Sequence, residues 1–130
     1  MARPEAERLT PLELEIMNVL WRLDNANVQA VQQALPRELA YTTVQTVLNI
    51  LQRKGKVKRA KRDRAYFYTP MVSQSQVARH AVSDMVERLF GGSAESLVMS
   101  MLEARQLTPQ KLDRLRRLVR EAREDGDDKN

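Results

Sequence analysis

Apolar residues recur at helical spacing in the first part of the chain, and capping residues mark where each helix begins. Residues 11–23 are predicted to form a helix, because Thr10 can cap it, Pro11 suits its first position and Glu13 can complete a capping box. Its apolar face holds Leu12, Ile16, Val19, Leu20 and Leu23. A shorter helix is predicted over residues 28–35, and Pro36 ends it.

A third helix is predicted over residues 41–54, stopped by Gly55, and its two faces differ in chemistry. One face is apolar and consists of Val44, Val47, Leu48 and Leu51. The opposite face and its flanks carry Thr42, Gln45, Thr46, Asn49, Gln52 and Arg53. Solvated helix faces are usually rich in Glu and Lys, whereas the side chains of this face are mostly uncharged groups that can donate and accept hydrogen bonds. The pattern therefore indicates a contact surface.

Two short strands follow, at residues 57–60 and 65–69, joined by a charged turn at residues 61–64. The turn contains no Gly or Asn, so its type stays open. Three short helices followed by a hairpin describe a winged helix-turn-helix, in which the third helix enters the DNA major groove. We predict this DNA-binding domain over residues 1–70.

Residues 71–130 are predicted to form a helical dimerisation domain that ends in a frayed polar tail from Asp125 onward. Helix starts are expected at Ser73, Ser93 and Thr108, and Gly91 and Gly92 stop the first of these helices. About 60 residues of amphipathic helix cannot bury a large core alone, so we expect a homodimer. The predicted interface comprises Val82, Met85, Val86, Leu89, Phe90, Leu97, Met101, Leu112, Leu115, Leu118 and Val119.

Composition narrows the possible function. The 130 residues include no Cys and one His, which leaves no thiolate or multi-histidine metal site, and no cofactor or metal is expected. No apolar run approaches the roughly 20 residues of a membrane helix, and the first residues lack the apolar stretch of a signal peptide. The carboxylates show no arrangement typical of acid–base catalysis. We therefore expect a cytoplasmic, non-enzymatic protein.

The basic charge lies in the first half of the chain. The net charge is +5, and residues 1–70 account for all of it. Eight basic residues and one acidic residue fall between positions 53 and 64, a pattern that suits a polyanion such as DNA. The predicted phosphate contacts are Arg53, Lys56, Lys58, Arg59, Lys61, Arg62 and Arg64. The predicted base contacts are Thr42, Thr43, Gln45, Thr46 and Asn49, which favour A/T-containing sites.

Several of these residues have a plainer interpretation. Thr43 can cap its helix or touch phosphate, Asn49 can be a solvated helix residue, and Tyr66 and Tyr68 can cover the sheet rather than stack on bases. An alternative function is a winged-helix module that binds protein through its third helix. RNA binding has less support, because few aromatic residues are free to stack on unpaired bases.

Four ordered motifs resemble the penicillinase repressor family, of the BlaI/MecI type. They are the stretches LTPLELEIMNVLW at 9–21, YTTVQTVL at 41–48, RAYFYTP at 64–70 and LFGGS at 89–93. The resemblance implies a homodimeric repressor of β-lactamase or cell-wall-stress genes. It also implies operators with two-fold symmetry and half-sites of TACA/TGTA character.

In antibiotic-responsive members of that family, a membrane sensor protease triggers cleavage in the dimerisation region. The family's Asn-Phe cleavage bond aligns near Ser100 and Met101, and neither residue type is retained here. The resemblance therefore leaves the cleaved bond open. Copper-responsive relatives carry a C-terminal cysteine cluster, which this chain lacks. Ala40 stands where a better helix-capping residue is common.

Overall fold

The computed structural model describes residues 8–128 and divides the chain into two compact units, Met1–Ala81 and Val82–Asn130. The sequence predicts a boundary at Pro70, and the boundary between the two compact units falls inside helix α5 (Gln74–Leu89). The difference arises because α5 is one continuous helix whose first half groups with the preceding residues.

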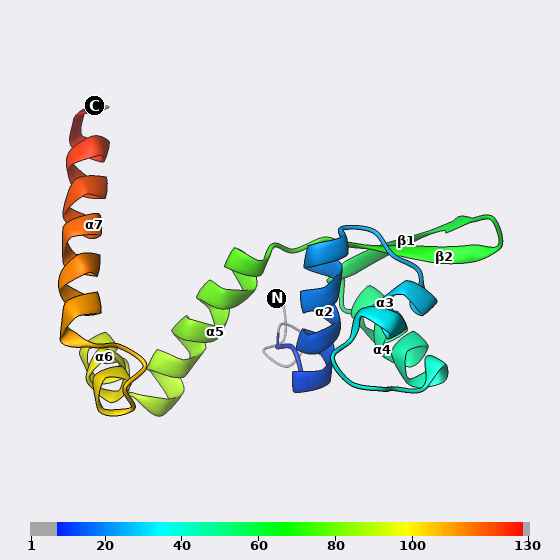
Figure 1. Cartoon of the computed structure of the whole chain (residues 1–130), viewed down its shortest axis with the longest axis horizontal. Coiled ribbons are helices and arrows are strands. Elements are labelled where there is room, and N and C mark those ends of the chain that lie inside the picture. The colour runs from blue at the N-terminus through cyan, green and yellow to red at the C-terminus, as the bar shows by residue number, and fades with distance from the viewer. Residues whose placement is uncertain (1–7, 129–130) are drawn as a thin grey trace. The chain divides into compact units, whose positions relative to one another are not determined.

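The first unit contains α2 (Pro11–Leu23), α3 (Val28–Ala34), α4 (Tyr41–Arg53) and an antiparallel hairpin of β1 (Val57–Arg62) and β2 (Ala65–Pro70) (Figure 1). The three predicted helices are confirmed to within one residue at each end. The predicted capping box is also confirmed. The Thr10 hydroxyl accepts a hydrogen bond from the Glu13 N–H at 3.1 Å, and Glu13 Oε1 accepts one from the Thr10 N–H at 2.8 Å.

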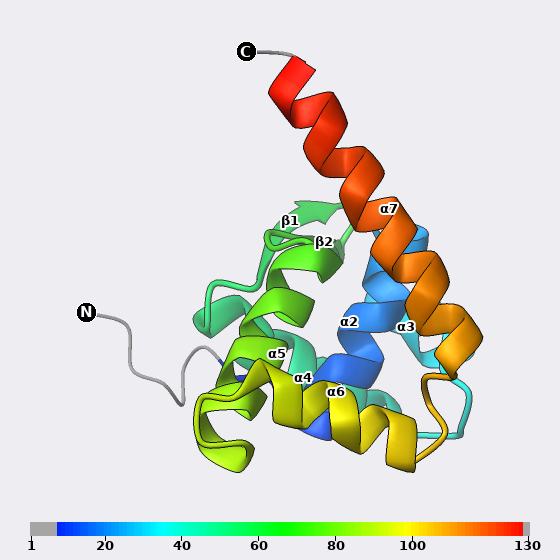
Figure 2. The ribbon, with the colours of Figure 1, turned by 90° about the vertical axis from the view of Figure 1, so that its left-hand side faces the viewer.

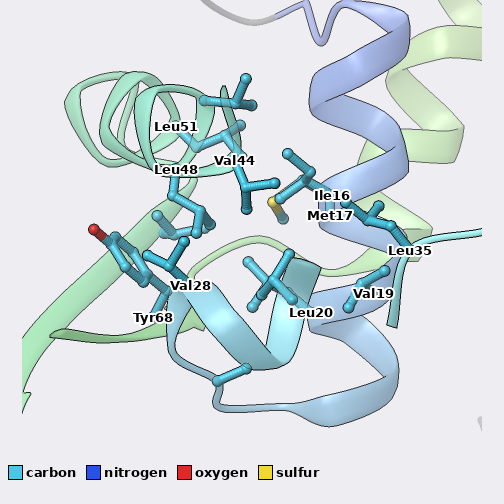
Figure 3. Close-up of a cluster of buried hydrophobic side chains, with 14 residues drawn as sticks. Ile16, Met17, Val19, Leu20, Val28, Leu35, Val44, Leu48, Leu51 and Tyr68 are labelled. Carbon is cyan, nitrogen blue, oxygen red and sulfur yellow. The ribbon is translucent and has the colours of Figure 1, made fainter. Parts of the chain in front are cut away.

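The core of this unit lies where α2, α3, α4 and the hairpin meet (Figure 3). Ile16, Met17 and Leu20 of α2 face Val44, Leu48 and Leu51 of α4, and all six side chains are buried. Tyr68 of β2 completes the cluster, with its ring among apolar side chains and its hydroxyl oxygen at the edge (Figure 3). The apolar face predicted for the third helix is therefore confirmed as its core face.

Helix α4 ends by a Schellman arrangement at Gly55, as its sequence predicts. The Lys56 N–H donates to the Leu51 carbonyl at 2.9 Å and the Gly55 N–H donates to the Gln52 carbonyl at 3.1 Å. Gly55 has a φ of +76°, which a glycine adopts without steric cost. Lys54, one residue earlier, reaches back to the buried Glu13 carboxylate at 2.9 Å. This ion pair ties the end of α4 to the start of α2.

The strands are longer than the sequence predicted. They reach Arg62 and Pro70, so that the turn shrinks to Asp63 and Arg64. Both turn residues have positive φ, 51° and 69°, the pattern of a type I′ turn. No Gly or Asn marks this turn in the sequence, and the predicted strands therefore stopped too early. A third segment joins the hairpin at Ala26, which exchanges two backbone hydrogen bonds with Tyr68.

The second unit holds the end of α5, then α6 (Ala94–Glu103) and α7 (Pro109–Asp128), the last drawn in orange and red in Figure 2. The predicted capping hydroxyls are in place. Ser93 Oγ accepts from the Ser96 N–H at 3.1 Å and Thr108 Oγ1 accepts from the Lys111 N–H at 3.2 Å. Gly91 and Gly92 follow α5 with positive φ, as a helix stop requires.

The tail expected to fray from Asp125 is instead helical as far as Asp128. Backbone hydrogen bonding continues α7 past its last apolar residue. The spacing of apolar side chains cannot predict this extension, because the added residues are polar. The last two residues of the predicted tail lie outside the described residues.

Replacing Ala40 with serine supplies a cap that α4 lacks. Ala40 already has the extended backbone of an N-cap residue but forms no side-chain cap hydrogen bond. We expect Ala40→Ser to raise the free energy of unfolding by about 1 kcal/mol, because serine pairs a free N–H of the first turn. Urea denaturation followed by the fluorescence of Trp21 measures this. Ala40→Leu is the control, and an equal gain in that variant would contradict the explanation.

Candidate nucleic-acid interface

The outward face of α4 is polar, uncharged and open to solvent. Thr42, Gln45 and Thr46 are exposed, and Thr43 is half-buried. They lie opposite the core residues Val44, Leu48 and Leu51, so the packing of one face orients the other. No acidic residue occurs in α4. These side chains can donate and accept hydrogen bonds without repelling a polyanion, which is the chemistry needed to read base edges.

The hairpin adds positive charge beside this helix. Six of the seven predicted phosphate contacts are exposed, and only Lys56 is half-buried. The exposed residues are Arg53, Lys58, Arg59, Lys61, Arg62 and Arg64. The positive charge predicted from the sequence thus lies at the surface, where phosphate contacts must form.

Two of these arginines lie over aromatic rings. The guanidinium carbon of Arg59 is 4.3 Å from the centre of the Tyr66 ring, and that of Arg62 is 4.2 Å from the centre of the Phe67 ring. Cation–π contact holds a guanidinium in place while leaving its N–H groups free to donate. Sequence reasoning missed this role of Tyr66 and Phe67, although an alternation of basic and aromatic residues across a hairpin is a usable signal.

Asn49 differs from the other predicted base contacts. It is half-buried, and its Oδ1 accepts hydrogen bonds from the Tyr68 hydroxyl at 3.1 Å and from Arg59 Nη1 at 2.9 Å. These hydrogen bonds were not predicted from local sequence patterns, because the partners lie 10 and 19 residues away in another element. The oxygen of this amide is thus engaged within the protein. Tyr68 is 1% exposed and belongs to the buried core, so its ring is not free to stack on bases.

The residues predicted to form a dimer interface are accessible in the single chain. In α5 and α7, Val82, Met85, Leu89, Leu115, Leu118 and Val119 are exposed, with Leu89 at 72%. The remaining five are half-buried: Val86, Phe90, Leu97, Met101 and Leu112. Ser100 and Met101 lie half-buried in α6. Leu107 is the only buried side chain among residues 82–125.

Among residues 8–128, the structure shows no cluster of three or more His, Cys, Asp or Glu side chains that could hold a metal ion. In the same part of the chain, no helix is both long and apolar enough to cross a membrane.

The helical core, the exposed polar face of α4 and the basic hairpin define a winged-helix DNA-binding protein. A family model described as penicillinase repressor matches residues 9–121. The chain belongs to the penicillinase repressor family, and it is a DNA-binding transcriptional repressor rather than an enzyme.

Individual relatives agree with this assignment. The chain is 35% identical over 118 residues to the transcriptional regulator BlaI of Mycobacterium tuberculosis, covering 88% of this chain and 84% of that protein. It is 28% identical over 116 residues to the penicillinase repressor of Bacillus licheniformis, covering 88% and 91%. The solution structure of the DNA-binding domain of the repressor BlaI superposes with a TM-score of 0.50 at 30% identity. The superposition covers 58% of this chain and 92% of that domain.

Proposed function

We propose that this repressor acts in the cytoplasm as a homodimer on operator DNA with two-fold symmetry. An uncharged, exposed face on α4 lies beside a basic hairpin that is hydrogen-bonded to the same helix, and this pairing supports the proposal. One surface supplies base contacts and the other supplies phosphate contacts. A module that binds protein would gain nothing from the basic hairpin.

The chemistry of α4 suggests the kind of base sequence that is read. Gln45 can form two hydrogen bonds with adenine, and the methyl group of Thr42 or Thr46 can pack on a thymine methyl. Half-sites of TACA/TGTA character offer both bases. The name of the Bacillus licheniformis relative points to penicillinase, a β-lactamase, as a regulated gene, and cell-wall-stress genes are the further candidates.

The second unit supports the homodimer. Apolar side chains of α5 and α7 are exposed to solvent in the single chain, and a second copy carries the same apolar surface. Dimerisation places two α4 helices on one operator. Two weak half-site contacts then act together, which raises the affinity for the operator far above that of a single DNA-binding unit.

Cleavage in α6 would release the repressor. A cut near Ser100 or Met101 separates Leu115, Leu118 and Val119 from the DNA-binding unit, and those residues are part of the proposed interface. We assign the cut to a membrane sensor protease that responds to β-lactam.

Operator binding tests the proposed function directly. We expect the full chain to bind the promoter region of its own gene more tightly than a shuffled duplex of equal length, with two protomers per site. Affinity should fall steeply with salt on both duplexes. The replacement of Gln45 and Thr46 together by alanine should lower the preference by about 1–3 kcal/mol per lost base contact.

The salt dependence of the double variant should match that of the wild type, because no phosphate contact is lost. Gln106→Ala, which changes an exposed glutamine outside α4, is the control. Equal, weak binding of the wild type to both duplexes would contradict operator recognition and would favour the protein-binding alternative.

Leu115→Glu tests the dimer. Leu115 is 46% exposed on α7, and a buried carboxylate at a dimer interface is strongly unfavourable. We expect the sedimentation mass to fall from that of two chains to that of one. Gln110→Glu adds the same charge at an exposed polar position of α7 and should leave the dimer intact. A mass unchanged by Leu115→Glu would be inconsistent with this interface.

Intact-mass measurement of the chain from cells treated with a β-lactam tests the cleavage. We expect a fragment that ends within α6 and retains the DNA-binding unit. Recovery of uncut chain at a time when the regulated gene is induced would exclude proteolysis as the release step.

A further inference from the structure

The side chain of Asn49 connects α4 to the hairpin through hydrogen bonds. Its Oδ1 accepts from the Tyr68 hydroxyl at 3.1 Å and from Arg59 Nη1 at 2.9 Å. A guanidinium can only donate hydrogen bonds, so the amide oxygen has to face Arg59 and the amide nitrogen has to face away. Tyr68 is buried, and it therefore fixes the position of this oxygen from the core side.

Arg59 is held from two directions. Asn49 accepts one of its N–H groups, and the Tyr66 ring lies 4.3 Å from its guanidinium carbon. Arg59 is nevertheless exposed, and within residues 8–128 no carboxylate forms an ion pair with it. Its charge is therefore available, and its orientation is set before a ligand arrives. A side chain ordered in advance loses less conformational entropy on binding.

Arg59 also lies on the face of the hairpin that is directed toward α4. It pairs with Tyr68 in the antiparallel register, and paired residues project on the same face of a hairpin. Arg62 lies three residues along the same strand, so its side chain projects on the opposite face. Arg62 contacts Phe67 at 4.2 Å, nearly the same distance as that from Arg59 to Tyr66. The two arginines thus form a matched pair on opposite faces.

We propose that Arg59 is the principal phosphate contact of the hairpin, that Asn49 and Tyr66 are its positioning residues, and that Arg62 faces away from bound DNA. The proposal rests on the proposed function, because it assumes that α4 and the hairpin lie against DNA together. The proposal gives different roles to Arg59 and Arg62, which were both predicted from the sequence as phosphate contacts. It also gives Asn49 a role in orienting a cation in place of reading a base.

The test measures binding of the full-length protein to the promoter duplex and to the shuffled duplex over a series of salt concentrations. We expect Arg59→Ala to raise the Kd by about tenfold or more on both duplexes. The salt slope should fall by about one for each bound protomer, as one lost phosphate contact requires. Arg62→Ala removes the same charge and should change the Kd less than about threefold, with the salt slope nearly unchanged.

Asn49→Ala distinguishes positioning from base reading. We expect it to weaken binding to both duplexes by the same factor, whereas loss of a base contact would weaken binding to the promoter alone. In the Arg59→Ala background, Asn49→Ala should have little further effect, because the residue through which it acts is already missing. Thermal unfolding of each variant identifies any that fail to fold, and Arg59→Lys, which keeps the charge without the planar fork, should restore only part of the affinity.

The proposal is overturned if Arg62→Ala weakens binding as much as Arg59→Ala does, or if the effects of Asn49→Ala and Arg59→Ala add. A loss of promoter preference in Asn49→Ala would also overturn it and would restore Asn49 as a base contact. These outcomes are separate from failure of operator recognition. Phosphate contacts act on any duplex, so the two arginines can be compared even if the wild type shows no sequence preference.

Discussion

Burial of its apolar face orients helix α4, and this packing positions the other parts of the DNA-binding unit. Val44, Leu48 and Leu51 are fully buried in the core that α4 shares with α2, α3 and the hairpin, and each contributes about 1.5–3 kcal/mol relative to an exposed side chain. Rotation of the helix about its axis would expose these residues. The side chains on the opposite face, Gln45 and Thr46 among them, are therefore directed toward solvent by the packing of the core face, without further contacts to orient them.

Tyr68 extends that constraint from the helix to the hairpin. Its ring lies in the core, its backbone exchanges two hydrogen bonds with Ala26, and its hydroxyl donates to Asn49. One residue of β2 therefore joins the hairpin to the core, to the segment before α3 and to α4. The same asparagine oxygen accepts from Arg59, so the position of a surface cation is tied to the position of a buried ring. The proposed base contacts and the proposed phosphate contacts therefore lie on two elements that are hydrogen-bonded to each other.

The parts of this structure that were predicted from sequence depend on local chemistry. Thr10 with Glu13 forms a reciprocal cap across three residues, and such a spacing can be recognised without a fold. The turn at Asp63 and Arg64 was not recognised, because its backbone conformation usually requires Gly or Asn. The hydrogen bonds of Asn49 were not predictable either, since they depend on how a hairpin packs against a helix.

The DNA-binding surface can be located by following the backbone amide chemical shifts of the full chain during titration with the promoter duplex. We expect the largest changes at the outward positions of α4, at Thr42, Gln45 and Thr46, and along β1 around Arg59. Changes in α6 and α7 should be small, because those helices are assigned to the dimer. Large changes confined to residues 82–128, with α4 unaffected, would contradict the assignment of α4 and the hairpin as the DNA-binding surface.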